Sequence, residues 1–320
     1  MTRALLLDEQ LRLSLGERQL APPRPGEALV RVEHAGVCGS DLHVLSSGAW
    51  VSYWPATLGH EVVGLVSSCP GGELAAGTRV VVDSRVPCGS CAGCSRAANL
   101  CERLAWVGEA FPGGFAEELV IAASSLVPCP QQLEPAIAVL AEPLAVAMHA
   151  VSRATRSPQR VLLLGYGPIG ALVHAEIEHR FPQAAVHVRE PLGSRRQLAA
   201  AFGADTSEPP AAPDLVVDAA GYPGSLVDAL ALTARGGELL VVALGHEAVS
   251  VVPADLVEQA VTVSGCSGFD DELPAAVARL AADPERYRPL VTEAVLLEEA
   301  VERLSAIGGQ PAAGKLVIAP

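Results

Sequence analysis

A glycine-rich segment near the middle of the chain constrains the fold most. It fits the pattern G-x-G-x-x-G and lies between a short apolar run at residues 161–164 and a helical stretch. In dinucleotide-binding loops the first glycine makes a tight turn, the second admits a pyrophosphate, and the third lets helix pack on strand. The helix N-terminus adds partial positive charge toward the phosphates. The expected cofactor loop comprises Gly165, Gly167, Pro168, Ile169 and Gly170.

Strand-like and helical stretches alternate from about residue 160 onward. The pattern predicts strands at residues 161–164, 185–189, 214–218 and 238–243, and helices at 194–202 and 225–233. Such alternation forms right-handed βαβ units around a parallel sheet. We therefore expect a doubly wound Rossmann domain of the α/β class.

An acidic residue follows the second expected strand. Glu190 lies 20 residues after Gly170, where a carboxylate can accept hydrogen bonds from the adenosine ribose and would repel a 2′-phosphate. This favours NAD over NADP. Three neighbouring arginines could instead serve a phosphate, and a glycine turn without a ligand is the remaining alternative. These arginines are Arg189, Arg195 and Arg196.

Four cysteines lie within fourteen residues, at Cys88, Cys91, Cys94 and Cys101. Four thiolates fill the tetrahedral shell of a structural zinc site. Disulfides are disfavoured, because the first residues do not resemble a signal peptide and cytosolic cysteine clusters more often bind metal. An iron–sulfur cluster is the other alternative, but the last gap of six residues and the following Glu102 depart from the ferredoxin pattern. Zinc is the expected metal.

A second, sparser set of metal-binding residue types precedes this lobe. Cys38 follows an expected strand, and His60 and Glu61 stand together at the start of the next one. Thiolate, imidazole and carboxylate with one open position make up the ligand set of a catalytic zinc. Taken singly, Cys38 could be a core thiol and His60 a hydrogen-bonded turn residue. The other cysteines, Cys69, Cys129 and Cys266, are expected to be buried thiols.

The N-terminal part is rich in valine strands. Strands are expected at residues 27–33, 61–66 and 79–83, whereas a helix at 297–306 and a strand at 315–318 could belong to either domain. The chain is thus expected to hold a β-rich domain followed by a doubly wound one.

Composition limits the partners and the location. The 320 residues include 22 basic and 36 acidic residues, and this net charge of −14 argues against nucleic acid or anionic membranes. No apolar run is expected to be long enough to span a membrane, because the longest candidate, residues 161–173, is interrupted by Gly-Tyr-Gly-Pro. We expect a cytoplasmic protein that acts on a small molecule.

Taken together, these motifs resemble the zinc-dependent medium-chain alcohol dehydrogenase family, nearly from end to end. The motifs occur in the family's order: Cys-Gly-Ser-Asp-Leu-His at 38–43, Gly-His-Glu-Val-Val-Gly at 59–64, the cysteine lobe at 88–101, Gly-Gly-Phe-Ala-Glu at 113–117, Glu-Pro-Leu at 142–144 and the glycine loop. The segment at Glu142 is similar to the polyol, sorbitol and threonine dehydrogenase branch. Two features depart from the family: the gap before Cys101 is one residue shorter, and the chain is short.

The resemblance implies the architecture. A GroES-like, β-rich catalytic domain would occupy residues 1–144 and 272–320, with the Rossmann domain inserted at 145–271 and the active site in the cleft between them. Family members are usually dimers or tetramers, so a homodimer or homotetramer is expected.

The resemblance also implies the chemistry. Cys38 and His60 would ligate the catalytic zinc, while Glu61 and Glu142 share the remaining role, one directly and one through water. The implied reaction interconverts a secondary alcohol (a polyol, cyclitol, sugar or other ring-bearing alcohol) and its ketone by hydride transfer to NAD(P). Two alternatives are a zinc-binding structural or regulatory protein without activity and a zinc-independent quinone or enoyl reductase.

Two further groups of residues have expected roles. By resemblance, Ser40 and His43 would relay the substrate proton to water. Six of the 12 aromatic residues cluster in the N-terminal part, and they could wall a substrate pocket or pack the core equally well. Those expected at the pocket are Trp50, Trp54 and Trp106, and the others are Tyr53, Phe111 and Phe115.

Overall fold

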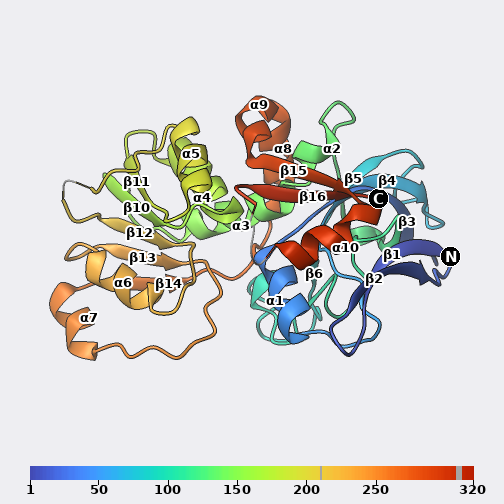
Figure 1. The fold of residues 1–320 in the computed structure, drawn as a ribbon, viewed down its shortest axis with the longest axis horizontal. Helices are drawn as coiled ribbons and strands as arrows, with labels where there is room; N and C mark the ends of the chain where they lie inside the picture. The colour runs from blue at the N-terminus through green and yellow to red at the C-terminus, as the bar shows by residue number, and fades with distance from the viewer. Residues whose placement is uncertain (210, 308–311) are drawn as a thin grey trace. The chain divides into compact units, whose positions relative to one another are not determined.

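The computed structural model describes residues 1–209, 211–307 and 312–320, which form two compact units. Unit 1 consists of Met1–Glu142 and Leu273–Pro320, and unit 2 of Pro143–Glu272. Figure 1 shows the elements of each unit coloured along the chain.

Unit 2 is built around a five-stranded parallel sheet with the order β11-β10-β12-β13-β14. The strands are β10 (Arg160–Leu164), β11 (Ala185–Arg189), β12 (Leu215–Asp218), β13 (Glu238–Val241) and β14 (Thr262–Gly265). Leu162, Leu164, Val216 and Leu239 are buried, as expected of central strands covered on both faces. The Rossmann-type parallel sheet is therefore confirmed.

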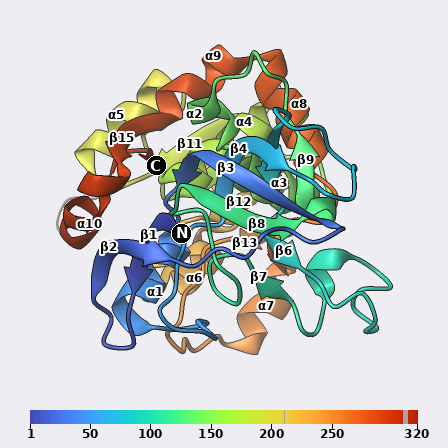
Figure 2. The same cartoon turned by 90° about the vertical axis from the view of Figure 1, so that its right-hand side faces the viewer.

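Helices cover both faces of this sheet. Figures 1 and 2 both place α4 (Pro168–Arg180) and α5 (Gly193–Ala201) on one side of the strands and α6 (Ser225–Leu232) on the other. Helix α7 (Pro253–Gln259) precedes β14, and α3 (Ala141–Ser152) leads into the unit. The strand order reverses between β10 and β12, and ligands of doubly wound sheets bind at such a switch point.

A shortened connection explains part of the small chain length. The dinucleotide-binding order 3-2-1-4-5-6 has a further strand beyond the one that corresponds to β11. Here only Asp205 pairs there, in a single parallel bridge to His187. The chain then returns across the sheet to β12 without another helix in the described residues 203–209 and 211–214.

Unit 1 contains a seven-stranded sheet with the order β15-β16-β3-β4-β5-β9, in which β8 also pairs with β3. Figure 2 shows β4 and β8 on either side of β3. The strands are β3 (Glu27–Gly36), β4 (Glu61–Ser68), β5 (Arg79–Val82), β8 (Glu118–Ala122), β9 (Leu126–Pro128), β15 (Val291–Leu296) and β16 (Lys315–Ala319). The C-terminal helix and strand thus belong to unit 1, since β16 pairs antiparallel with the end of β3.

Shorter elements complete unit 1. Two small antiparallel pairs join β1 (Thr2–Leu7) to β2 (Leu13–Arg18) and β6 (Arg85–Val86) to β7 (Ala105–Trp106). The helices are α1 (Gly39–Ser47), α2 (Pro135–Ala138), α8 (Leu273–Ala282), α9 (Pro284–Tyr287) and α10 (Leu297–Ala306), with 3-10 turns at Ala98–Leu100, Ala123–Ser125 and Arg288–Leu290.

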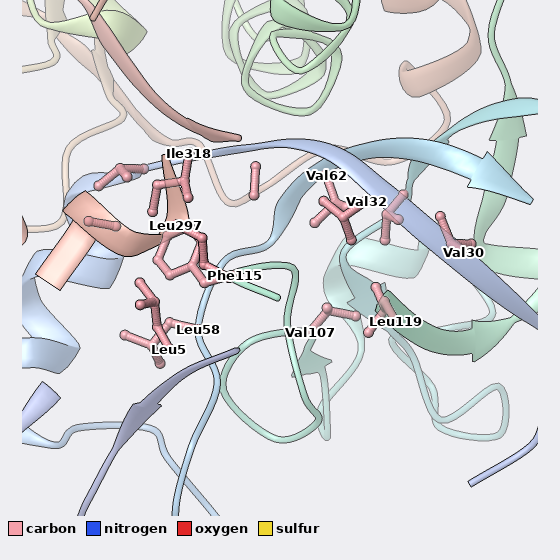
Figure 3. Packing of buried hydrophobic residues seen from close by; sticks show 14 of the residues in the cluster. Leu5, Val30, Val32, Leu58, Val62, Val107, Phe115, Leu119, Leu297 and Ile318 are labelled. Atoms are coloured by element: carbon pink, nitrogen blue, oxygen red, sulfur yellow. The ribbon is translucent and has the colours of Figure 1, made fainter. Parts of the chain in front are cut away.

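The core of unit 1 draws on segments from both ends of the chain. Figure 3 shows Leu5, Leu58, Phe115, Leu297 and Ile318 packed together, and all five are nearly fully buried. Val30, Val32 and Val62 extend the same cluster along β3 and β4. Burial of this apolar surface is what joins the C-terminal segment to the N-terminal strands.

The longest apolar stretch is not residues 161–173, as expected, but Pro135–Ser152. The stretch Pro135–Ser152 is long and apolar enough to cross a membrane by length and composition alone. However, 67% of it is buried within the protein. Such burial is the property of a core helix, and the apolar composition serves packing.

Candidate active site and metal centres

The loop after β3 presents Cys38 at the start of α1. Cys38 is the extended N-cap residue of this helix, and its backbone N–H donates to Asp41 Oδ2 over 2.8 Å. The Asp41 carboxylate lies in the first turn of α1, where it interacts favourably with the positive end of the helix dipole. Asp41 is buried, so its contacts hold the cysteine loop in one conformation.

The same carboxylate reaches the loop that carries His60. Asp41 Oδ1 accepts the Gly59 N–H over 3.3 Å and lies 3.7 Å from His60 Nδ1. Burial disfavours the charged imidazole, but the charge and hydrogen bond of Asp41 and those of Cys38 outweigh it and raise the pKa of His60 well above its usual range. Gly59 has φ of +93°, and a Cβ there would lie 2.5 Å from the Phe115 ring. Only glycine allows this approach.

Three ligand-type side chains meet at these loops. The Cys38 sulfur, a His60 ring nitrogen and a Glu61 carboxylate oxygen all lie within 4.8 Å of one another. Glu61 is fully buried, and its Oε2 has no hydrogen-bond partner among the described residues. A buried carboxylate oxygen without a donor is costly unless a cation satisfies it. The donor set of sulfur, nitrogen and oxygen is therefore one that fits zinc.

Lys315 on β16 supports Glu61 from behind. Its ammonium Nζ donates to Glu61 Oε1 over 2.6 Å and to the Val37 carbonyl over 3.1 Å, and its side chain is almost fully buried. Burial disfavours the charged amine, but the negative charges of Glu61 and Cys38 outweigh it and raise the pKa of Lys315. The sequence interpretation missed this residue, although it is the only lysine among 22 basic residues and stands in an apolar strand.

Glu142 lies at the start of α3, also buried. Its Oε1 accepts a hydrogen bond from the Ser84 hydroxyl over 2.8 Å. Burial, together with the charge of Glu61, raises the pKa of Glu142 to about 7 despite the opposing charge of His60. Glu142 is near enough to feel both residues electrostatically, but its carboxylate is not among the atoms that meet within 4.8 Å.

Helix α1 also carries the two relay candidates. Ser40 and His43 are three residues apart, so they lie on the same helix face. The Trp50 ring packs against His43, with centroids 4.8 Å apart and planes tilted by 45°. Trp50, which was expected at the substrate pocket, therefore contacts His43, which was expected in the proton relay.

The remaining aromatic candidates divide between scaffold and surface. Trp54 and Tyr53 pack against the core cluster, and Phe115 is part of it. Trp106 lies half-buried in β7, and Phe111 is exposed. These contacts favour a packing role for Trp54 and Phe115.

The four-cysteine lobe forms a compact sulfur cluster. Sulfur–sulfur distances are 3.5 Å for Cys91–Cys94, 3.9 Å for Cys88–Cys94 and 3.9 Å for Cys91–Cys101. A tetrahedral zinc with Zn–S bonds of about 2.3 Å requires sulfurs about 3.8 Å apart. All four cysteines are free thiols, and a hydrogen bond with Arg103 lowers the pKa of Cys88 to about 5. The structure joins none of these four sulfurs in a disulfide, and their spacing fits a metal.

A close approach explains how the lobe closes over its shortened last gap. The 3-10 turn Ala98–Leu100 brings the Leu100 carbonyl against Gly93, where a Cβ would lie only 1.7 Å from that oxygen. Backbone N–H groups of Cys88 and Arg103 then point at the Cys101 sulfur over 3.2 and 3.3 Å.

Two of the other three cysteines depart from expectation. Cys129 is buried, but Cys69 and Cys266 are only half-buried. The Cys69 sulfur donates to Glu73 Oε2 over 3.0 Å, because it lies in the surface turn that follows β4. The expectation of three buried thiols is therefore wrong for two of them.

In unit 2 the glycine loop has the geometry of a phosphate cradle. Gly165 has φ of +87°, and a Cβ on Gly170 would lie 2.3 Å from the Gly165 carbonyl oxygen. A Cβ on Gly167 would lie 3.6 Å from the Arg195 guanidinium, so this arginine extends over the loop. Helix α4 begins at Pro168, directly after the loop.

Glu190 is held in place at the end of β11. Its two carboxylate oxygens accept the backbone N–H groups of Tyr166 (2.8 Å) and Leu192 (2.9 Å), and the side chain is buried. Arg189 pairs with Glu208, and Arg196 donates to the backbone carbonyls of Glu190 and Pro191. Of the three arginines, Arg195 is the one beside the glycine loop.

Tyr166 connects the glycine loop to helix α4. Its ring is fully buried, and its hydroxyl lies 2.7 Å from His174 Nδ1 on α4. The sequence interpretation passed over this pair, because a tyrosine at a variable position of the loop carries no signal by itself.

One unit has a dinucleotide-type sheet, and the other has a four-sulfur cluster and a separate Cys–His–Glu set. This combination is typical of a metal-dependent oxidoreductase. Residues 24–131 match the alcohol dehydrogenase GroES-like domain. The chain is 31% identical to D-altritol 5-dehydrogenase of Agrobacterium fabrum, covering 99% of both chains, and 31% identical to sorbitol dehydrogenase of Gallus gallus, covering 91% of this chain and 88% of that one. An alcohol dehydrogenase of Escherichia coli solved with NADH superposes with a TM-score of 0.90 at 25% identity, covering 100% and 99%.

The chain therefore belongs to the zinc-type medium-chain alcohol dehydrogenase family. Its named relatives are oxidoreductases, so an inactive structural protein and a zinc-independent reductase are not favoured.

Proposed function

We propose that this protein is a zinc-dependent oxidoreductase that interconverts a secondary alcohol, of the polyol, cyclitol or sugar kind, and its ketone with NAD(P). The observation that carries the proposal is the meeting of Cys38, His60 and Glu61 within 4.8 Å, with one Glu61 oxygen left unsatisfied. The altritol and sorbitol dehydrogenases support a polyol substrate. Unit 1 would carry the zinc chemistry and unit 2 the cofactor.

The proposed ligands of the catalytic zinc are Cys38, His60 and Glu61. Glu142 is proposed to act beside them, because its oxygen is already engaged by Ser84 and its carboxylate lies outside the group that meets. The four cysteines of the lobe are proposed to hold a second, structural zinc. When bound, zinc supplies Lewis-acid stabilisation of negative charge on oxygen, and the nicotinamide accepts hydride.

Side chains of the protein orient the proposed zinc ligands and are proposed to transfer the substrate proton. Asp41 fixes the Cys38 and His60 loops relative to each other through its two carboxylate oxygens. Ser40 and His43, on one face of α1, are proposed to pass the substrate proton toward water. Lys315 holds the buried Glu61 carboxylate in a single orientation.

NAD is the proposed cofactor, with NADP less favoured. The glycine loop would receive the pyrophosphate at the N-terminus of α4, close to Arg195. Glu190 is held by two amides, so its charge cannot turn aside to admit a 2′-phosphate.

The test is a reduction screen combined with metal analysis. We expect NAD⁺ reduction with at least one secondary alcohol, polyol, cyclitol or sugar, and about two zinc ions per chain. Cys38→Ser should abolish turnover and remove one zinc, while Cys69→Ser, outside both sets, should leave both unchanged. A chain with two zincs that reduces neither cofactor with any alcohol would contradict the proposal.

We further propose a cytoplasmic homodimer or homotetramer. Support comes from β14, an edge strand of the unit 2 sheet, and from the exposed valines Val252, Val257 and Val263 on and beside it. Light scattering on a size-exclusion column tests the assembly, and a monomer at micromolar concentration would contradict it.

A further inference from the structure

Two surface loops of unit 1 join beside the proposed zinc ligands. The loop at residues 48–54 donates to the turn at residues 106–111, from the Ser52 N–H to the Glu109 carbonyl over 3.2 Å. The turn is closed on itself by the Glu109 and Ala110 N–H groups, which both donate to the Trp106 carbonyl. These two segments form a single connected layer, here called the rim.

The rim lies against the backbone that carries His60. Gly108 has φ of +86°, and a Cβ there would lie 3.1 Å from the Gly59 backbone nitrogen. Gly114 also donates its N–H to the Gly59 carbonyl over 2.8 Å. The turn therefore lies close to the backbone of the proposed ligand His60 at Gly108, and the segment that follows the turn is hydrogen-bonded to Gly59.

Glu109 is the charged residue of this turn. It is half-buried and interacts electrostatically with His60 and Asp41. Burial, together with the charge of Asp41, raises the pKa of Glu109, while His60 opposes the rise. Among the described residues, its carboxylate accepts no hydrogen bond and forms no ion pair. A half-buried carboxylate that no protein donor engages can still accept hydrogen bonds, and a ligand with hydroxyl groups can supply them.

Trp50 provides an apolar surface on the same rim. Its backbone has φ of +67°, a conformation that a bulky residue adopts only when its surroundings impose it, and such residues gather at functional sites. The ring packs on His43, yet 43% of the residue is exposed. An amphipathic carbohydrate chain can place its C–H face on such a ring and its hydroxyls toward an acceptor.

We propose that Glu109 is a specificity-determining residue that selects uncharged polyhydroxy alcohols and rejects sugar acids and sugar phosphates, with Trp50 as the stacking surface. This inference rests on the proposed function. A carboxylate accepts hydrogen bonds from hydroxyls but repels a carboxylate or phosphate on the substrate. At a separation of about 6 Å and an effective dielectric of about 20, that repulsion corresponds to on the order of 100-fold in kcat/KM.

The test compares substrates with one carbon skeleton: a hexitol, the matching hexonate and the matching hexitol phosphate. We expect wild-type kcat/KM to favour the hexitol by about 100-fold. Glu109→Gln keeps the shape and a hydrogen-bonding group but removes the charge, so it should raise the hexonate-to-hexitol ratio at least tenfold. Added salt should weaken the discrimination in wild type and not in the variant. Glu9→Gln, at an exposed position of the β1–β2 turn, is the matched control and should change nothing.

A binding measurement distinguishes an effect of Trp50 on substrate binding from an effect on the catalytic step. Calorimetric titration of the zinc-loaded protein with the hexitol should show weaker binding for Trp50→Leu, and the same variant should raise KM with little change in kcat. Equal use of hexitol and hexonate by wild type, or an unchanged ratio in Glu109→Gln, overturns this inference while the proposed function stands. Failure of every alcohol, charged or neutral, overturns both.

Discussion

At the residue scale, the pair of Lys315 and Glu61 shows how one contact can govern a site. Both side chains are fully buried, and the ammonium is 2.6 Å from the carboxylate. Removing one partner of a buried pair leaves an uncompensated charge, whereas removing both is often tolerated.

We predict that Lys315→Met lowers the free energy of unfolding by about 3 kcal/mol. Urea denaturation measures the loss. The double variant Lys315→Met with Glu61→Gln should recover most of this stability, because no buried charge is then left unpaired. If the double variant is as unstable as Lys315→Met, the lysine acts through packing and not through its charge.

A second prediction at this scale concerns the proton relay. His43→Gln should lower kcat by about 100-fold at pH 7, the smaller end of general acid–base contributions, and the deficit should shrink as hydroxide replaces the relay at high pH. His179→Gln, at an exposed position on α4, serves as the control. A pH–rate profile parallel to that of the wild type would remove His43 from the relay.

At the scale of single elements, the helices and strands that the sequence predicted are present, but others, such as β14, α7 and α8, were not predicted. The helix at residues 297–306 is found with the same bounds, and each expected strand of the Rossmann domain is present within a residue or two. These elements depend on local periodicity and local glycine positions, which the sequence displays directly. No local pattern predicts that one Rossmann strand is reduced to the single Asp205 bridge. Whether a further edge strand forms depends on the rest of the folded sheet, which a local pattern does not describe.

The cysteine lobe yields the prediction at this scale. Gly93→Ala should disrupt the lobe, because its Cβ would lie 1.7 Å from the Leu100 carbonyl and backbone cannot yield as a flexible side chain can. Metal analysis should show zinc content falling from about two toward one per chain. Gly265→Ala, where a Cβ meets nothing within 4 Å, is the matched control. Two zincs retained in Gly93→Ala would mean that the loop closes differently.

At the scale of the whole molecule, a hydrogen-bonded contact between His149 and Glu272 joins the two ends of unit 2. His149 Nδ1 on α3 lies 2.8 Å from Oε1 of Glu272, the last residue of the unit. Burial opposes ionisation of Glu272, but hydrogen bonds from His149 and the Asp270 N–H outweigh it and lower its pKa. An acid whose pKa is lower in the folded state stabilises the fold above its unfolded pKa of about 4.3 and loses that contribution as pH falls through the folded pKa.

We therefore predict that Glu272→Gln destabilises unit 2 by about 1 kcal/mol at pH 7, the usual size of a charge-assisted hydrogen bond on a partly exposed group. The difference from wild type should shrink as pH falls below about 4.3 and vanish once Glu272 is protonated in the folded protein. Thermal unfolding at pH 3.5, 5 and 7 measures both values, with exposed Glu258→Gln as the control. If the difference in stability between Glu272→Gln and wild type does not change with pH, the effect comes from side-chain packing and not from the charge of Glu272.

The sequence by itself determined about half of the strands, and it named the two zinc ligand sets and the cofactor loop as candidates. The reason is that spacing within a short segment decides which side chains share a turn, a strand or a helix face. It also carried the resemblance that led to the family.

Only the tertiary structure decided which distant residues support those candidates. Lys315 lies 254 positions from Glu61, and Glu109 reaches the surroundings of His60 because the turn at residues 106–111 packs on the Gly59 backbone. Contacts across such separations depend on sheet order and on burial of a shared core, which no local pattern records. For this reason the candidate ligands and Trp50 could be named from the sequence, while Lys315 and Glu109 could not.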